Sequence, residues 1–194
     1  FMTLMLKPEI NPNNASMLTL VAALAVAEAI KDVTGLDARI KWPNDIVING
    51  KKICGILTEM SAQFDYINHI VIGIGINVHN EAFPEEISAV AGSILLESGG
   101  RRFRRAEIIE KTLEHFEEYY EIYLQTEDLS ALTADYNALL VNMNKQVKVL
   151  DPKDEFEGKA MGITAKGELI VDTWESRKLV SSGEVSVRGI YGYV

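Results

Sequence analysis

The string Lys41-Trp42-Pro43-Asn44-Asp45 places a cation, an amide and a carboxylate within five consecutive residues. Proline has a fixed φ angle and pushes the residue before it toward an extended backbone, so these polar groups are expected on a rigid elbow. A lysine held there can neutralise charge that develops on a carboxylate or phosphoryl oxygen. An aspartate four residues later can pair with it or hold a hydrated magnesium ion. The pattern also fits an exposed turn whose tryptophan packs on the core.

Glycines interrupt two apolar strands that follow the elbow. Gly73 and Gly75 lie in residues 67–78, but the third glycine of a dinucleotide fingerprint and the helix that must follow it are missing, so a Rossmann site is not favoured. Glycine in a strand permits close approach of a ligand or of another backbone. Asn77, at the end of this run, offers donors and an acceptor. A bulged strand packed on a helix explains the same glycines without a ligand.

Histidine and cysteine usage excludes several kinds of site. His69, His79 and His115 are spread along the chain without metal-ligand spacing, which gives no support to a zinc site or a catalytic triad. The single cysteine, Cys54, excludes an internal disulfide and a cysteine-rich zinc cluster. This usage suits a reducing compartment, so we expect a cytoplasmic protein.

The charge of the chain is negative and unevenly distributed. The 194 residues hold 19 Lys and Arg against 28 Asp and Glu, a net charge of −9, which disfavours a general electrostatic grip on nucleic acid or on an anionic membrane. Residues 81–144 carry five basic and thirteen acidic side chains, which accounts for −8 of the total. The basic run at residues 101–105 precedes an acidic helix and is interpreted as balancing its charge. No membrane span or signal peptide is predicted.

The periodicity of apolar residues predicts the elements of the first 144 residues. Residues 14–34 are predicted to form a buried helix that ends at Gly35. Short strands at 39–41 and 46–48 are followed by Asn49-Gly50, which favours a type I′ hairpin turn, and by a return strand at 52–60. Residues 129–140 are predicted to form a short helix. Residues 106–125 are predicted to form an amphipathic helix whose buried face comprises Ile109, Leu113, Phe116, Tyr120 and Tyr123.

Beyond residue 144 the pattern changes to five short alternating strands. We therefore expect an α+β protein, with a mixed sheet and packed helices in residues 1–144 and a small β-barrel in residues 145–194. The run at residues 67–78 is predicted to lie at a sheet edge and to pair with its copy, which would give a homodimer. The first six residues read as a strand entered from upstream, so the chain is expected to be part of something longer.

The motifs occur in a characteristic order. The elbow is followed by KICGILTE at residues 52–59, by IGIGIN at residues 72–77 and by GEVSVR at residues 183–188. This series resembles that of biotin protein ligases, the biotin–[acetyl-CoA-carboxylase] ligase family, over essentially the whole chain. The resemblance implies a biotin/lipoate ligase-like catalytic domain followed by a small SH3-like β-barrel.

The resemblance also implies an activity and its substrates. Biotin and ATP, with Mg²⁺, would give biotinyl-5′-AMP, and biotin would then pass to a lysine of a biotin carboxyl carrier protein. Lys41 would be catalytic, and Asp45 would help to place magnesium. The residues implied in biotin binding are Lys41, Ile46, Gly55, Ile56, Leu57, Gly73 and Ile74. Those implied in ATP binding are Asn77, Lys41 and Arg188.

Two parts of the family pattern lie before residue 1. They are the glycine- and arginine-rich loop that closes over biotinyl-AMP and the serine/threonine segment that recognises the ureido ring. Two other functions stay open for the same chain. One is a biotin-responsive transcriptional repressor, whose N-terminal DNA-binding domain would lie outside this sequence. The other is a lipoate-handling enzyme of related fold.

Overall fold

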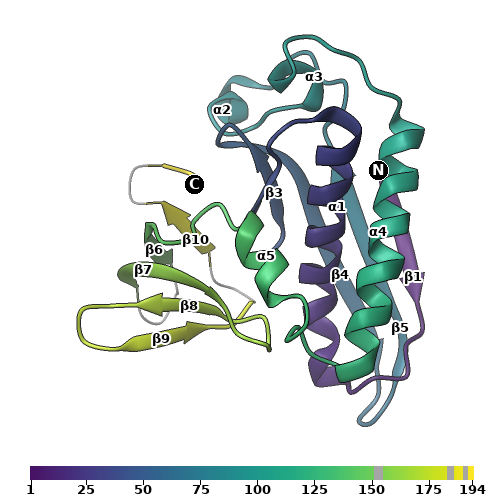
Figure 1. Cartoon of the computed structure of the whole chain (residues 1–194), viewed down its shortest axis with the longest axis vertical. Coiled ribbons are helices and arrows are strands. Elements are labelled where there is room, and N and C mark those ends of the chain that lie inside the picture. The colour runs from purple at the N-terminus through teal and green to yellow at the C-terminus, as the bar shows by residue number, and fades with distance from the viewer. Residues whose placement is uncertain (151–154, 183–185, 190–191) are drawn as a thin grey trace.

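The computed structural model describes residues 1–150, 155–182, 186–189 and 192–194, which form two antiparallel sheets with helices packed on the first (Figure 1). The first sheet has the strand order β1-β5-β4-β3-β2. The bounds of its strands are β1 Met2–Leu6, β2 Arg39–Lys41, β3 Asp45–Ile48, β4 Lys51–Ala62 and β5 Ile67–Ile76.

The strand directions correct two predictions. The sheet is not mixed, because each pair of neighbouring strands in it runs antiparallel. Strands β2 to β5 follow one another through short connections, and a tight turn returns the chain beside itself in the opposite direction. Asn49 and Gly50 have φ angles of 50° and 77°, as a type I′ turn requires. Strand β5 lies between β1 and β4, so it is not an edge strand, and the homodimer predicted from its free edge loses its basis.

Helices α1 (Leu18–Thr34) and α4 (Arg105–Thr126) cover one face of this sheet (Figure 1). The chain enters α1 through the 3-10 helix η1 (Pro12–Met17) and leaves it at Gly35, which has a left-handed φ of 71°. Most of α1 is buried, because its many alanines leave room for the sheet on one side and α4 on the other. The helix predicted at residues 14–34 is thus confirmed from Leu18 onward, with its stop at Gly35, whereas residues 14–17 belong to η1.

The buried face of α4 is rotated from the predicted one. Phe116 and Tyr123 are buried as expected, but Ile109 and Leu113 are exposed. Ile108 and Thr112 take their places in the core. The predicted and the observed buried faces both have spacings of three and four residues, as one face of a helix requires. The observed face includes a threonine, which made it look less apolar than the predicted one. Thr112 is accommodated because its hydroxyl donates to the carbonyl oxygen of Ile108 at 2.7 Å.

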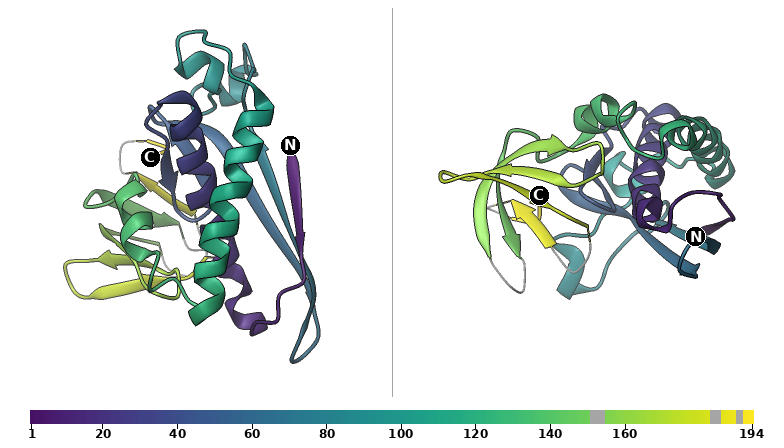
Figure 2. Two further views of the ribbon diagram at one scale, coloured as in Figure 1. Left: turned by 45° about the vertical axis from the view of Figure 1, so that its right-hand side comes forward. Right: turned by 90° about the horizontal axis from the view of Figure 1, so that it is seen from below.

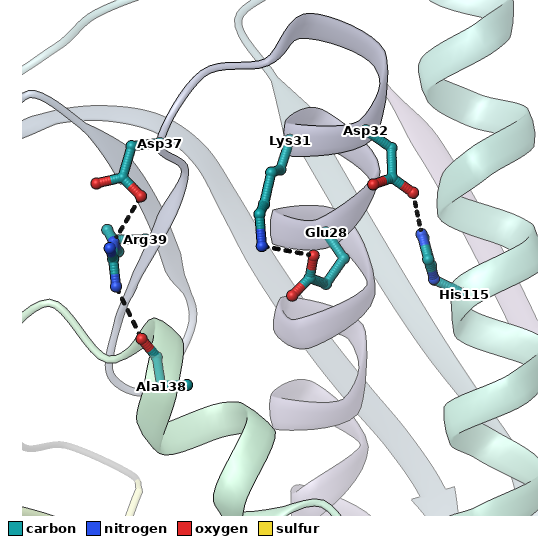
Figure 3. Close-up of polar contacts among 7 residues, drawn as sticks. All are labelled: Glu28, Lys31, Asp32, Asp37, Arg39, His115 and Ala138. Carbon is teal, nitrogen blue, oxygen red and sulfur yellow. Dashed lines mark hydrogen bonds and ion pairs between the residues drawn. The ribbon is translucent and has the colours of Figure 1, made fainter.

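Polar contacts join α1 to its neighbours at the molecular surface (Figure 3). Nε2 of His115, on α4, lies 2.8 Å from Oδ2 of Asp32, on α1. Lys31 pairs with Glu28 within α1 at 3.3 Å. Contacts of this kind at a surface contribute roughly 0–1 kcal/mol each. His115 therefore helps to align two helices and lies apart from the motifs.

Shorter helices follow the first sheet. They are α2 (Glu85–Ser88), α3 (Ile94–Glu97) and, after α4, α5 (Thr133–Leu139). Gly99 and Gly100 have φ angles of 71° and 89° and turn the chain between α3 and α4. Within the described residues, no helix is both long enough and apolar enough to cross a membrane.

The second sheet has the strand order β10-β6-β7-β8-β9, and its strands also run antiparallel. Their bounds are β6 Gln146–Leu150, β7 Phe156–Ile163, β8 Leu169–Asp172, β9 Arg177–Val180 and β10 Ser186–Gly189. Five short strands were predicted and are found, but the closed barrel is wrong, because β9 and β10 are the two edges of an open sheet. Strands of four residues offer few bonds for the stagger that closure needs. Residues 183–185 of the last motif lie outside the described residues.

The second sheet stands beside the first domain and contacts the elbow (Figure 2). Nε1 of Trp42 donates to the carbonyl oxygen of Gly167 at 2.9 Å. The backbone N–H of Val141 donates to the carbonyl oxygen of Ile40 at 2.9 Å. The elbow is therefore tied through Trp42 to the turn between β7 and β8, and Ile40, just before the elbow, is tied to the segment that leads into the second domain.

Candidate active site

A row of four residues crosses the first sheet from the elbow to β5. The strand register pairs Lys41 with Asp45, Asp45 with Gly55, and Gly55 with Gly75. Neighbouring residues in a strand point to opposite faces. Ile40, next to Lys41, belongs to the core. The row therefore lies on the face of the sheet that α1 and α4 leave uncovered.

Lys41 is a buried cation without an acceptor. Its residue is 6% exposed, and within the described part of the chain its ammonium makes no hydrogen bond or ion pair. Its contact is the ring of Tyr193, whose centroid lies 4.3 Å from Nζ. Burial lowers the pKa of Lys41, and the carboxylate of Asp45 raises it. A desolvated ammonium with free donors favours the arrival of an anionic group.

Asp45 is held from two sides. Its residue is 7% exposed, and Oδ1 lies 2.5 Å from Nζ of Lys52. Oδ2 accepts a hydrogen bond from the hydroxyl of Tyr193. In the described ranges no three His, Cys, Asp or Glu side chains lie close enough to share a metal ion. These surroundings do not fit a magnesium ion held by the protein alone, and the role of Asp45 toward magnesium stays a prediction.

Gly55 makes room for Lys52. A Cβ atom at residue 55 would lie 3.2 Å from Cε and 3.3 Å from Nζ of that lysine. The lysine side chain thus crosses Gly55 on its way to Asp45. Lys52 was not singled out from the sequence, although the Asn49-Gly50 turn folds β4 back onto β3 and brings the two residues to one face. Tyr193 was also missed, because nothing local connects it to residue 41.

The seven residues implied in biotin binding divide between the two faces. Ile46, Ile56 and Ile74 are 0%, 2% and 1% exposed and belong to the core that packs against α1. The structure does not bring their side chains to the face of Lys41. Leu57 and Gly73 are cross-strand partners in the row next to Gly55 and Gly75, on the uncovered face. Leu57 is 64% exposed.

The two glycines of β5 have different neighbours. A Cβ atom at Gly73 would lie 3.7 Å from the carbonyl oxygen of Leu57 and would meet nothing closer. At Gly75 it would lie 2.9 Å from the ring of Phe1. A flat ligand can therefore approach the sheet at Gly73, whereas Phe1 already covers Gly75.

Asn77 and Arg188 approach the row from other segments. Nδ2 of Asn77 donates to the carbonyl oxygen of Gly92 at 3.0 Å, which ties the end of β5 to the loop before α3. Its role toward a nucleotide stays a prediction. Arg188 lies on β10 and, with Tyr193, lines a cleft of about 700 Å³. The positive charges of Arg188 and Lys52 lower the pKa of Lys41 further.

A second cleft, of about 390 Å³, borders the elbow on the other side. Its lining residues come from η1, α1, the elbow, β4 and the end of the second domain: Ala15, Ser16, Thr19, Pro43, Asn44, Ile56, Leu57, Thr58, Met60 and Ser182. Volumes of this size are usual for small-molecule sites. The charges that shift the pKa of Lys41 are those of Lys52, Arg188 and Asp45, so cations outnumber the carboxylate around this lysine in a chain of net charge −9.

Comparisons with known proteins point to one family. The model of the biotin/lipoate A/B protein ligase family matches residues 1–77, and that of the biotin protein ligase C-terminal domain matches residues 143–188. The bifunctional ligase/repressor BirA of Bacillus subtilis is 36% identical over 189 residues, which are 96% of this chain and 58% of that protein. The biotin–[acetyl-CoA-carboxylase] ligase of Mycobacterium tuberculosis is 31% identical over 87% of this chain and 61% of its own length.

The fold has relatives among solved structures as well. The biotin protein ligase of Aquifex aeolicus, in complex with biotin and ATP, superposes with a TM-score of 0.83 at 30% identity. The match covers 96% of this chain and 77% of that one. The chain spans about three fifths of the curated relatives, but the matches run through both of its domains. We conclude that the chain belongs to the biotin protein ligase family.

Proposed function

We propose that this chain activates biotin with ATP and transfers it to a lysine of a biotin carboxyl carrier protein. The observation that carries the proposal is the buried ammonium of Lys41, which has no acceptor among the residues that the structure describes and lies near further cations. Family membership and the Aquifex complex with biotin and ATP support the choice of substrates.

In the first step, an oxygen of the biotin carboxylate attacks the α-phosphorus of ATP, and pyrophosphate leaves. The two reactants are both anions and repel one another. The ammonium of Lys41 offsets that repulsion when it contacts the carboxylate and an α-phosphate oxygen together, and it stabilises the charge that develops in the transition state. Arg188, from the second sheet, supplies positive charge on the side of the cleft it lines.

In the second step, the neutral amine of a carrier lysine attacks the acyl carbon of biotinyl-5′-AMP. The amide bond forms, its nitrogen releases a proton to solvent, the bond between the acyl carbon and the phosphate oxygen breaks, and AMP leaves with a negative charge. Lys41 stabilises this leaving group in the same way. Leu57 and Gly73 form a flat apolar surface on the uncovered face, which suits the biotin ring system. No step is assigned to a magnesium ion.

The test compares Lys41→Ala with the wild-type chain. Pyrophosphate release is measured with biotin and ATP, and carrier biotinylation is followed by intact mass. We expect a loss on the order of 10²–10³-fold in both, as for other single electrostatic contacts in transition states. Lys31→Ala removes an exposed lysine of α1 (Figure 3) and serves as the matched control. An active, folded Lys41→Ala variant would refute the assigned role.

A lipoate-handling enzyme is the second candidate, because the family model that matches residues 1–77 covers lipoate ligases as well. Ligands that bind the folded state raise the melting temperature. We expect biotin to raise Tm and lipoate to leave it unchanged. The reverse result would favour the lipoate function.

A biotin-responsive repressor is the third candidate function, because the Bacillus subtilis relative is named a bifunctional ligase/repressor. The gene product's intact mass, together with a DNA-binding assay with and without biotin, tests this function. We further expect the protein to work in a reducing, cytoplasmic compartment, since its one cysteine is free and buried.

A further inference from the structure

We infer that Tyr193 is a positioning residue that keeps Lys41 available to its substrates by holding Asp45 away from it. The inference rests on the ligase function proposed above. Tyr193 follows the last strand of the second sheet, yet its side chain reaches the elbow of the first domain. Its ring lies over Nζ of Lys41, and its hydroxyl donates to Asp45.

The register of the first sheet creates the need for such a residue. Lys41 and Asp45 are direct cross-strand partners on neighbouring strands. Opposite charges at such positions normally pair. A lysine engaged by its own aspartate would have to break that pair before it could contact a substrate anion. In the structure, no ion pair joins them within the described residues.

Two groups hold the carboxylate instead. Nζ of Lys52 lies at Oδ1, and the Tyr193 hydroxyl lies at Oδ2, so both oxygens of Asp45 have partners. Burial and the contact with Asp45 raise the pKa of Tyr193 above its ordinary value, so the phenol remains a donor. The negative charge of Asp45 still acts on Lys41 across the sheet, but each oxygen of the carboxylate has its contact elsewhere, Oδ1 with the Lys52 ammonium and Oδ2 with the Tyr193 hydroxyl.

The ring of Tyr193 contributes separately from its hydroxyl. An aromatic face attracts an ammonium without accepting a hydrogen bond, so all three N–H donors of Lys41 stay free. The tail that carries the ring contacts both domains. The N–H of Gly192 donates to the carbonyl oxygen of Gly189, and a Cβ atom at Gly50, in the turn of the first sheet, would lie 3.3 Å from Cγ2 of Val194.

The first experiment separates the hydroxyl from the ring. In Tyr193→Phe the ring remains, and Asp45 is free to pair with Lys41. We expect the KM for ATP and biotin to rise about tenfold, equivalent to 1.4 kcal/mol, with kcat less affected. Tyr119→Phe, on α4, is the matched control. Unchanged kinetics would overturn the inference, and so would a gain in kcat/KM, which would show that the tail only obstructs the site.

A double-mutant cycle then asks whether Tyr193 acts through Asp45. In an Asp45→Asn background the partner carries no charge, so we expect Tyr193→Phe to change KM less than twofold. Equal effects in both backgrounds would contradict the inference, because additive changes indicate independent action. Folding of each variant is checked by its urea unfolding curve.

A third measurement does not depend on ligase activity. Acetic anhydride labels exposed lysine amines, and peptide mass mapping compares Lys41 with the exposed Lys31. We expect Tyr193→Phe, which keeps the ring, to lower labelling of Lys41 several-fold relative to Lys31, because a lysine amine paired with Asp45 is less reactive. Equal labelling in the wild type and the variant would overturn the inference. A wild-type chain that fails to biotinylate its carrier would instead refute the proposed function. The labelling result would still show whether Tyr193 keeps Asp45 away from Lys41.

Discussion

The two faces of the first sheet are built from the same strands but differ in burial, in packing and in charge. On the covered face, Ile56 and Ile74 are cross-strand partners buried under α1. On the uncovered face, the neighbouring positions are Leu57, which is exposed, and glycine. Apolar burial stabilises the fold on one side, while the other side holds a charge that burial disfavours. Because side chains alternate between the two faces of a strand, one residue can stabilise the core while the next one is available to bind a ligand.

The largest effect is expected on the covered face. Ile74→Ala removes buried methyl groups and leaves a cavity beneath α1, so we expect it to lower the free energy of unfolding by about 2–5 kcal/mol. Urea denaturation measures this loss. The specific activity of the molecules that remain folded should be close to that of the wild type. A loss of activity at full stability would contradict the division between the faces.

Lys41→Met is expected to change the free energy of unfolding in the opposite direction. Replacing a buried ammonium that meets no acceptor in the described part of the chain with an apolar side chain of similar length should raise the free energy of unfolding by about 1–4 kcal/mol at pH 7. Activity should be lost at the same time. This variant therefore separates stability from function more sharply than an alanine substitution.

The pH dependence of that gain follows from the lowered pKa of Lys41. At neutral pH the folded chain carries a charge that it disfavours relative to the unfolded chain, so the wild type is penalised. As pH rises through the folded-state pKa toward the ordinary value of 10.5, the wild type loses this penalty. The difference between Lys41→Met and the wild type should shrink over that range. A difference that grows with pH would show that folding does not lower the pKa of Lys41.

Gly55→Ala is expected to have a smaller effect, confined to the uncovered face. The new methyl group would crowd the Lys52 side chain and displace its ammonium from Asp45, because the lysine can move and the strand cannot. We expect roughly a tenfold loss of activity, or about 1.4 kcal/mol in the transition state. Pyrophosphate release measures it, and Lys52→Ala should lower the rate by a similar factor.

The smallest effect is expected from Leu57→Ser, since this side chain is already exposed. We expect the free energy of unfolding to change by less than about 0.5 kcal/mol. Affinity for biotin, measured by calorimetry, should fall if Leu57 lies against the ring system. A stability loss as large as that of Ile74→Ala would show that the two faces are not distinct.

Most elements could be predicted from the sequence because their signals are local. Turn residues such as Asn49-Gly50 and Gly35, and the periods of the strands and of α1, lie within a few residues of what they determine. The errors in strand arrangement concern pairing over longer distances, whereas the rotated buried face of α4 is a local error that arose because Thr112 is polar. The position of β5 inside the sheet depends on β1, more than sixty residues earlier, and the open second sheet depends on how its two end strands lie.

The site was predicted in part for the same reason. Lys41 and Asp45 share one motif, and their placement opposite each other follows from the turn between β2 and β3. The side chains of Ile56 and Leu57 point to opposite faces of β4, although both residues line the cleft of about 390 Å³, and their roles toward biotin stay predictions. Tyr193 contacts Asp45 across 148 positions of sequence, and only the folded arrangement of the two sheets reveals it.

The hydrogen bond from Trp42 to Gly167 links the elbow mechanically to the second sheet. Trp42 directly follows Lys41, so the backbone that carries the lysine is anchored to the second domain as well as to the first sheet. If ligand binding at Lys41 and the position of the second sheet are coupled through this bond, the coupling free energy must be the same in both directions.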